Sequence, residues 1–206
     1  MSSWRGHRLE VGECPFILWS YLGPATVIFF RMRVVFGGTS GLPRVEWSRE
    51  GRELVLLREA LNERSVAVGA EPDGWQEAVE TSGNLLVASG TVEERYVAAM
   101  VRTVEELGPY AVIAPGVAIP HARPEDGAKS VGLSLAVLSE PVEFGSKEND
   151  PVDLVFGFST TDSDAHIELI QALADFIEKP ENTDALREAK TAEEILRIVE
   201  RSEEHA

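Results

Sequence analysis

The stretch 152–177, VDLVFGFSTTDSDAHIELIQALADFI, joins a strand pattern to a helix pattern and places a histidine at their junction. Val152 to Phe158 is a strand-like run that is apolar apart from Asp153 and rich in β-branched and aromatic residues, which indicates a buried strand. Polar residues that cap helices follow at 159–164, and the apolar spacing is then helical up to Ile177. His166 is therefore predicted in the first turn of a helix, where free backbone N–H groups attract anions and disfavour imidazolium.

The same alternation of strand and helix patterns extends from Glu53 to the end of the chain. It is typical of an α/β domain, in which helices cover both faces of a central sheet and binding sites lie at strand ends. Strands are predicted at 65–70, 111–114, 132–138 and 152–158, and helices at 54–61, 74–89, 91–106, 166–177, 183–189 and 191–201.

Three of the predicted helices begin with capping residues. Asp73 precedes the second helix and is expected to cap it. Thr91 with Glu94, and Thr191 with Glu194, have the spacing of a capping box, in which each side chain bonds the other residue's backbone N–H.

A second histidine lies in GVAIPHARPEDG, residues 116–127. Pro120 fixes its own φ and biases the residue before it towards an extended backbone, so His121 is expected to leave a strand end in a defined direction. Arg123 offers a fork of donors that suits phosphate or carboxylate and repels a metal cation. The bland alternatives are that His121 is a hydrogen-bonded turn residue and His166 a solvent-facing polar residue.

Phosphoryl transfer requires mainly positioning and charge stabilisation, which His121, Arg123 and His166 would supply. The ordinary pKa of histidine, about 6.5, leaves much of the side chain neutral and nucleophilic near pH 7. The apolar residues 117–119 beside His121 are either part of a docking rim for a partner protein or ordinary strand residues.

These blocks resemble the enzyme IIA components of the bacterial phosphoenolpyruvate-dependent sugar phosphotransferase system, in the mannitol and fructose superfamily. The similarity is closest to the ascorbate-type branch and covers about Glu53 to Arg201. It implies a three-layer α/β sandwich with a central mixed sheet flanked by helices on both faces. The matching segments are residues 108–110, 112–116, 119–127, 141–145, 148–152 and 165–169.

The resemblance implies a phosphoryl relay. The histidine phosphocarrier protein would phosphorylate His121, which would pass the group to a cysteine of the IIB component and, indirectly, serve a membrane IIC component. His166 would orient or stabilise the phosphorylated ring. The sugar would be ascorbate or a related carbohydrate, and the alternative is a regulatory module that binds a transcription factor or transporter according to its phosphorylation.

The chain departs from the family at one position of the helix before the histidine block. Mannitol-type and fructose-type members usually carry an arginine where Thr103 stands, and the neighbouring Arg102 would point elsewhere because successive helical residues are rotated by about 100°. Arg123 is therefore the expected phosphate stabiliser in this protein.

The composition favours a cytoplasmic protein that does not bind nucleic acid. The chain has 206 residues, of which 35 are acidic and 19 are lysine or arginine, and this net charge of −16 disfavours nucleic acid and anionic membranes. Cys14 is the single cysteine, so an internal disulfide is impossible and an acceptor cysteine must come from another polypeptide.

The domain is expected at 53–206, after an extension and linker at 1–52 that is poorly ordered or peripheral. The extension contains an uncharged run, 14–30, that is slightly short for a membrane span and contains Pro24. The glycine-rich segment 37–41 is expected to act as a linker. The run could also be a signal peptide, or lie upstream of the natural start.

Neither a cofactor nor a metal is expected. A hydrolase that binds metal through His121, His166 and Asp162 or Asp164 is disfavoured because Arg123 opposes a cation and the HExxH spacing is missing. The sequence also has no phosphate-binding loop of a nucleotide-driven kinase. His7 and His205, in the terminal segments, are expected to be bystanders.

Overall fold

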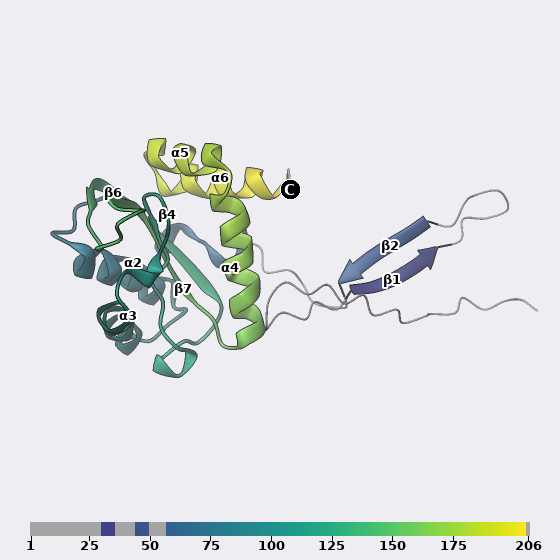
Figure 1. Ribbon diagram of the computed structural model, residues 1–206, viewed down its shortest axis with the longest axis horizontal. Coiled ribbons are helices and arrows are strands. Elements are labelled where there is room, and N and C mark those ends of the chain that lie inside the picture. Colours follow the sequence, from purple (N-terminus) through teal and green to yellow (C-terminus); the bar gives the residue numbers. More distant parts are fainter. Residues whose placement is uncertain (1–29, 36–43, 50–56, 205–206) are drawn as a thin grey trace, which may run out of the picture. The chain divides into compact units, whose positions relative to one another are not determined.

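The computed structural model describes residues 30–35, 44–49 and 57–204 (Figure 1). The chain divides after Glu53 into two units, which we treat separately. In the first unit, strands β1 (Phe30–Val35) and β2 (Arg44–Arg49) pair antiparallel. The sequence analysis predicted neither strand; the expected linker and all but the last residue of the run 14–30 lie outside the described residues.

The second unit contains a five-stranded sheet with strand order β3-β6-β7-β5-β4. Strand β3 is parallel to β6 and β5 is parallel to β7, whereas β6 with β7 and β4 with β5 are antiparallel, so the sheet is mixed as expected. The strands are β3 (Val66–Ala70), β4 (Val112–Ala114), β5 (Val117–Ala118), β6 (Gly132–Val142) and β7 (Val152–Ser159).

Helices cover both faces of this sheet, which confirms the predicted three-layer α/β architecture. Figure 1 shows α2 and α3 on one side of the strands and α4 on the other. The helices are α1 (Leu57–Ala60), α2 (Trp75–Ser89), α3 (Glu94–Leu107), α4 (Ser163–Ile177), α5 (Pro180–Glu188) and α6 (Ala192–Glu204), with short 3₁₀ turns at Glu63–Ser65, Pro109–Ala111 and Pro124–Asp126.

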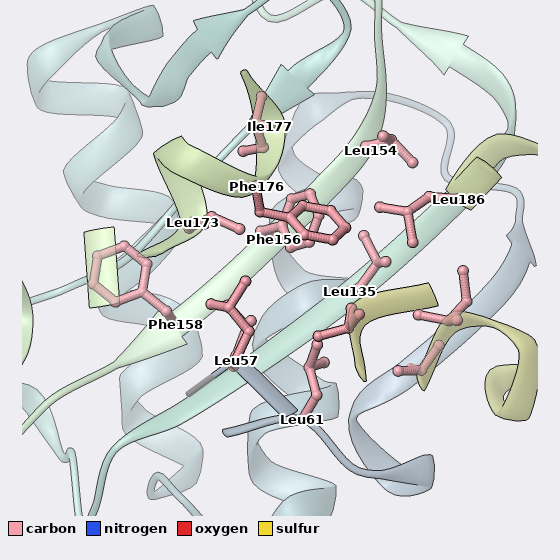
Figure 2. Close-up of a cluster of buried hydrophobic side chains, with 14 of the residues drawn as sticks. Leu57, Leu61, Leu135, Leu154, Phe156, Phe158, Leu173, Phe176, Ile177 and Leu186 are labelled. Carbon is pink, nitrogen blue, oxygen red and sulfur yellow. The ribbon is translucent and has the colours of Figure 1, made fainter. Parts of the chain in front are cut away.

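Each face of the sheet has its own hydrophobic core, because successive strand residues point to opposite faces. Leu154, Phe156 and Phe158 of β7 face the core under α1, α4, α5 and α6. Figure 2 shows these three side chains together with other residues of that core. Val155 between them faces the core formed with α2 and α3. This explains why 152–158 is apolar apart from Asp153, which pairs with Arg187 at 2.7 Å: β7 is buried on both sides.

Two of the three predicted helix caps are wrong. Helix α2 starts after Gly74 without a side-chain cap, and Glu77 instead reaches back to accept the N–H of Asp73 at 2.8 Å. The N-cap of α3 is Glu93, since Thr91 donates its hydroxyl to Leu86 O at 3.1 Å, across the turn after α2. The local spacing predicted a cap, but the Thr91 hydroxyl bonds a carbonyl at the end of α2 and does not cap α3.

The third cap is confirmed for Thr191, but its partner glutamate bonds the preceding residue, Lys190, and not Thr191 itself. Thr191 Oγ1 accepts the N–H of Glu194 at 3.2 Å, and the Glu194 carboxylate accepts the N–H of Lys190 at 2.6 Å. The short helix predicted at 183–189 begins earlier, at Pro180, which is the first residue of α5. A proline is tolerated there because the first residues of a helix need no backbone N–H partner. Within the described residues, none of the helices has the length and apolar character needed to cross a membrane.

Candidate functional site

The topology brings the two histidines together at the C-terminal ends of two neighbouring strands of the sheet. His121 follows β5, and His166 lies in the first turns of α4, which follows β7. Because β5 and β7 are adjacent and parallel, with Val117 opposite Leu154 and Ala118 opposite Val155, both chains leave the sheet at the same end. Both histidines therefore lie at strand ends on the same side of the sheet, as the sequence predicts.

The imidazole rings of His121 and His166 are direct neighbours, with centroids 5.2 Å apart. Phe158, at the end of β7, packs against both rings, with centroid distances of 4.2 Å to His121 and 5.3 Å to His166. Tyr110 approaches His121 edge-on at 5.9 Å. Two imidazoles thus share an aromatic wall, which limits the water around them.

A backbone hydrogen bond selects the tautomer of His121. Its Nδ1 lies 2.9 Å from Ile119 O. A carbonyl oxygen only accepts, so Nδ1 must carry the proton in the neutral ring and Nε2 keeps its lone pair. Burial lowers the pKa of His121, the Ile119 carbonyl opposes this shift, and His166 adds to it. The neutral, nucleophilic form is favoured at neutral pH.

His166 is also favoured in its neutral form, because burial lowers its pKa. The helix start around it differs from the expectation of free N–H groups. Asp162 Oδ1 accepts the N–H groups of Asp164 at 3.0 Å and Ala165 at 2.9 Å. An internal carboxylate therefore occupies two of the donors that an anion would use.

The loop that carries His121 is held by two tyrosines that the sequence analysis did not single out. The hydroxyl of Tyr96, in α3, lies 2.9 Å from Ala122 O and accepts the N–H of Ala122 at 3.2 Å. Tyr110 donates its hydroxyl to His121 O at 3.3 Å. Neither contact has a local sequence signal, since Tyr96 reads as an ordinary apolar position of an amphipathic helix.

Arg123 is exposed and lies two residues beyond His121, where the chain enters the turn Pro124–Asp126. Within residues 57–204 it forms no ion pair. Thr103, at the family's usual arginine position, donates its hydroxyl to Ala99 O at 2.8 Å along its own helix. Among residues 57–204, no side-chain hydrogen bond or ion pair holds the Arg123 guanidinium beside the ring cluster formed by both histidines, Phe158 and Tyr110.

The proposed docking rim at residues 117–119 is wrong. Val117, Ala118 and Ile119 are 1%, 0% and 5% exposed, and they belong to the two cores. The ordinary strand interpretation is correct, because β5 lies inside the sheet between β7 and β4. The exposed apolar residue beside the site is Ile167, at 57%.

The acidic residues of this region do not complete a metal site with the histidines. Among the residues described, no group of three or more His, Cys, Asp and Glu side chains is arranged to hold a metal ion.

Residues 59–202 match the family model of the phosphoenolpyruvate-dependent sugar phosphotransferase system, EIIA 2. The chain belongs to this family. This enzyme IIA protein is 44% identical over 148 residues to the ascorbate-specific phosphotransferase system EIIA component of Escherichia coli strain K12, an alignment that covers 71% of the chain and 96% of the relative.

Solved structures of enzyme IIA proteins share the fold. The mannitol-specific cryptic enzyme IIA CmtB of Escherichia coli is 37% identical, with a TM-score of 0.64 over 70% of this chain and 98% of CmtB. The enzyme IIAMTL in a complex with phosphorylated enzyme IIBMTL, also from Escherichia coli, is 27% identical, with a TM-score of 0.60 over 68% of this chain and 96% of IIAMTL. The extension before residue 57 is outside the family match.

Proposed function

We propose that this enzyme IIA protein accepts a phosphoryl group on Nε2 of His121 and passes it to a cysteine of a IIB protein. One observation carries the proposal: the Nδ1–H of His121 is fixed on Ile119 O at 2.9 Å, which leaves Nε2 as the nitrogen with a free electron pair. Lowering of the His121 pKa by burial keeps this pair available at neutral pH.

In the accepting step, His121 Nε2 attacks the phosphorus of a phosphohistidine on the phosphocarrier protein. The new N–P bond forms as the old one breaks, and the donor nitrogen keeps the electron pair of the broken bond. The His121 ring gains positive charge, which the Ile119 carbonyl stabilises through Nδ1–H. In the donating step, a cysteine thiolate forms an S–P bond, and the N–P electrons return to Nε2.

His166 and Arg123 are assigned supporting roles. The ring of His166, 5.2 Å from that of His121, is close enough to donate a hydrogen bond to an oxygen of a phosphoryl group held there. Arg123 is exposed beside the loop and would contact the phosphoryl group while a partner is docked. We expect the Arg123 contribution to be smaller, since its side chain is not held in the ring cluster.

The ascorbate-specific relatives, at 44% identity, favour ascorbate or a related carbohydrate as the transported sugar. The direct partners are then the histidine phosphocarrier protein and an ascorbate-type IIB protein, with the membrane IIC component served through IIB. With these partners, we infer that the carrier domain, residues 53–206, works in the cytoplasm.

The test is incubation with phosphoenolpyruvate, enzyme I and the phosphocarrier protein, followed by mass spectrometry under conditions that preserve phosphohistidine. Wild-type protein and His205→Gln, a matched histidine replacement, should carry phosphate on His121. His121→Gln should carry none. Labelling of folded His121→Gln at the wild-type rate would refute the assignment.

A second step separates transport from regulation. Purified phosphorylated protein is mixed with an ascorbate-type IIB protein, or with a mannitol-type IIB protein as the specificity control. Transfer of phosphate to the ascorbate-type IIB protein, and not to the mannitol-type protein, would support a role in ascorbate transport. Retention of phosphate with both would favour the regulatory alternative.

A further inference from the structure

The hydroxyl of Tyr96 connects three separate elements beneath the histidine pair. Tyr96 belongs to α3 and is 1% exposed. Its oxygen lies 2.9 Å from Ala122 O and 3.0 Å from Phe158 O, and it accepts the N–H of Ala122 at 3.2 Å. One buried oxygen thus contacts the residue after His121 and Phe158, near the end of β7.

The loop 119–122 depends on such contacts because it has no regular secondary structure. Buried backbone groups in a loop must find partners elsewhere or destabilise the fold. Ile119 O accepts from His121 Nδ1, His121 O accepts from Tyr110, and both backbone groups of Ala122 contact Tyr96. Tyr96 therefore holds the C-terminal side of the bend that presents the His121 ring.

The contact with Phe158 O extends this constraint to the aromatic wall. The Phe158 ring packs at 4.2 Å on His121 and at 5.3 Å on His166. Fixing the Phe158 backbone relative to Ala122 fixes the separation between this wall and the nucleophile. Burial raises the pKa of Tyr96 to about 12, so the hydroxyl keeps its proton and remains a donor across the physiological pH range.

We propose that Tyr96 is a positioning residue, which holds the His121 ring in the orientation and tautomer required for phosphoryl transfer by bonding Ala122 and Phe158 at once. This inference rests on the proposed function for its effect on rate. Its effect on the His121 tautomer does not, because the tautomer is measured on unphosphorylated protein.

The test compares wild type with Tyr96→Phe, which removes one oxygen and keeps the ring. Nitrogen-15 NMR of the imidazole should show His121 as the Nδ1–H tautomer in the wild type. Tyr96→Phe frees Ala122, so the bend loosens, the bond to Ile119 O weakens and the Nε2–H form increases. Misplacement of a reacting group by about 1 Å can cost roughly a hundredfold in rate, so we expect phosphorylation to slow by about tenfold to a hundredfold.

Ile195→Val is the matched control for stability. Ile195 is fully buried in α6, which contacts β3 at the opposite edge of the sheet from β5. It should lower the melting temperature without changing the His121 tautomer or the phosphorylation rate.

Each outcome decides the inference. A shifted tautomer with slowed labelling in Tyr96→Phe, and neither in Ile195→Val, supports it. An unchanged tautomer and rate would overturn it, as would an unfolded Tyr96→Phe, since the hydroxyl would then serve only the fold. If wild-type protein accepts no phosphate but the tautomer still shifts in Tyr96→Phe, the proposed function fails while the positioning contact stands.

Discussion

Replacement of Phe158 by alanine should change the titration of both histidines. Phe158 is 1% exposed, and its ring packs against both imidazoles. Burial is the main cause of the lowered pKa of His121 and also lowers the pKa of His166. Removing the ring lets water reach both imidazoles, so both pKa values should rise towards the ordinary value of histidine.

The same replacement has a cost in stability. Truncation of a buried phenylalanine to alanine typically costs about 3–5 kcal/mol. Domains usually unfold with about 5–15 kcal/mol, so the variant should be clearly weakened and still folded. Phe158→Leu keeps most of the apolar volume and should cost less than about 1.5 kcal/mol. It should also raise the two pKa values less than Phe158→Ala does.

The assay is an NMR titration of the imidazole carbons, combined with urea unfolding of the same samples. The order expected for the His121 pKa is wild type lowest, then Phe158→Leu, then Phe158→Ala. If folded Phe158→Ala titrates His121 as the wild type does, the aromatic wall does not set its protonation, and this reasoning is wrong.

Two further predictions concern stability. Both histidines have lowered pKa values, so as pH falls through about 6.5 the unfolded chain binds protons more readily than the folded chain. The free energy of unfolding should therefore be highest above that pH and decline below it. In His121→Gln, the difference between the free energies from urea unfolding at pH 7.5 and at pH 5.5 should be smaller. Gly116 has φ +76°, and an added Cβ would lie 2.7 Å from Arg187 Nη2 and 2.8 Å from Asp153 Oδ1. Gly116→Ala should therefore cost about 1–3 kcal/mol in urea unfolding. His121 should still be phosphorylated, because Gly116 lies at the other end of β5; an equal loss of labelling would contradict this separation.

Much of the fold followed from local patterns. The largely apolar run 152–158 and the helical spacing after it predicted β7 and α4 within a few residues, because burial on two faces and on one face leave different periodicities. Strand β5, two residues long, was not predicted as a separate element because it is too short to show a period. The caps at Asp73 and Thr91 failed because their spacing is common and the neighbouring turn decides which partner is bound.

The sequence by itself determined most elements of the second unit, the family and the two histidines, since these depend on residue types and on spacing along the chain. Tertiary structure decided the rest of the site. It placed the ring centroids of the two imidazoles 5.2 Å apart, buried residues 117–119 in the cores, and bonded Asp162 to the N–H groups of the helix start. It also joined Tyr96 to Phe158, which is 62 residues further along. No local pattern encodes such a contact, because it depends on which strands are neighbours and in which direction each of them leaves the sheet.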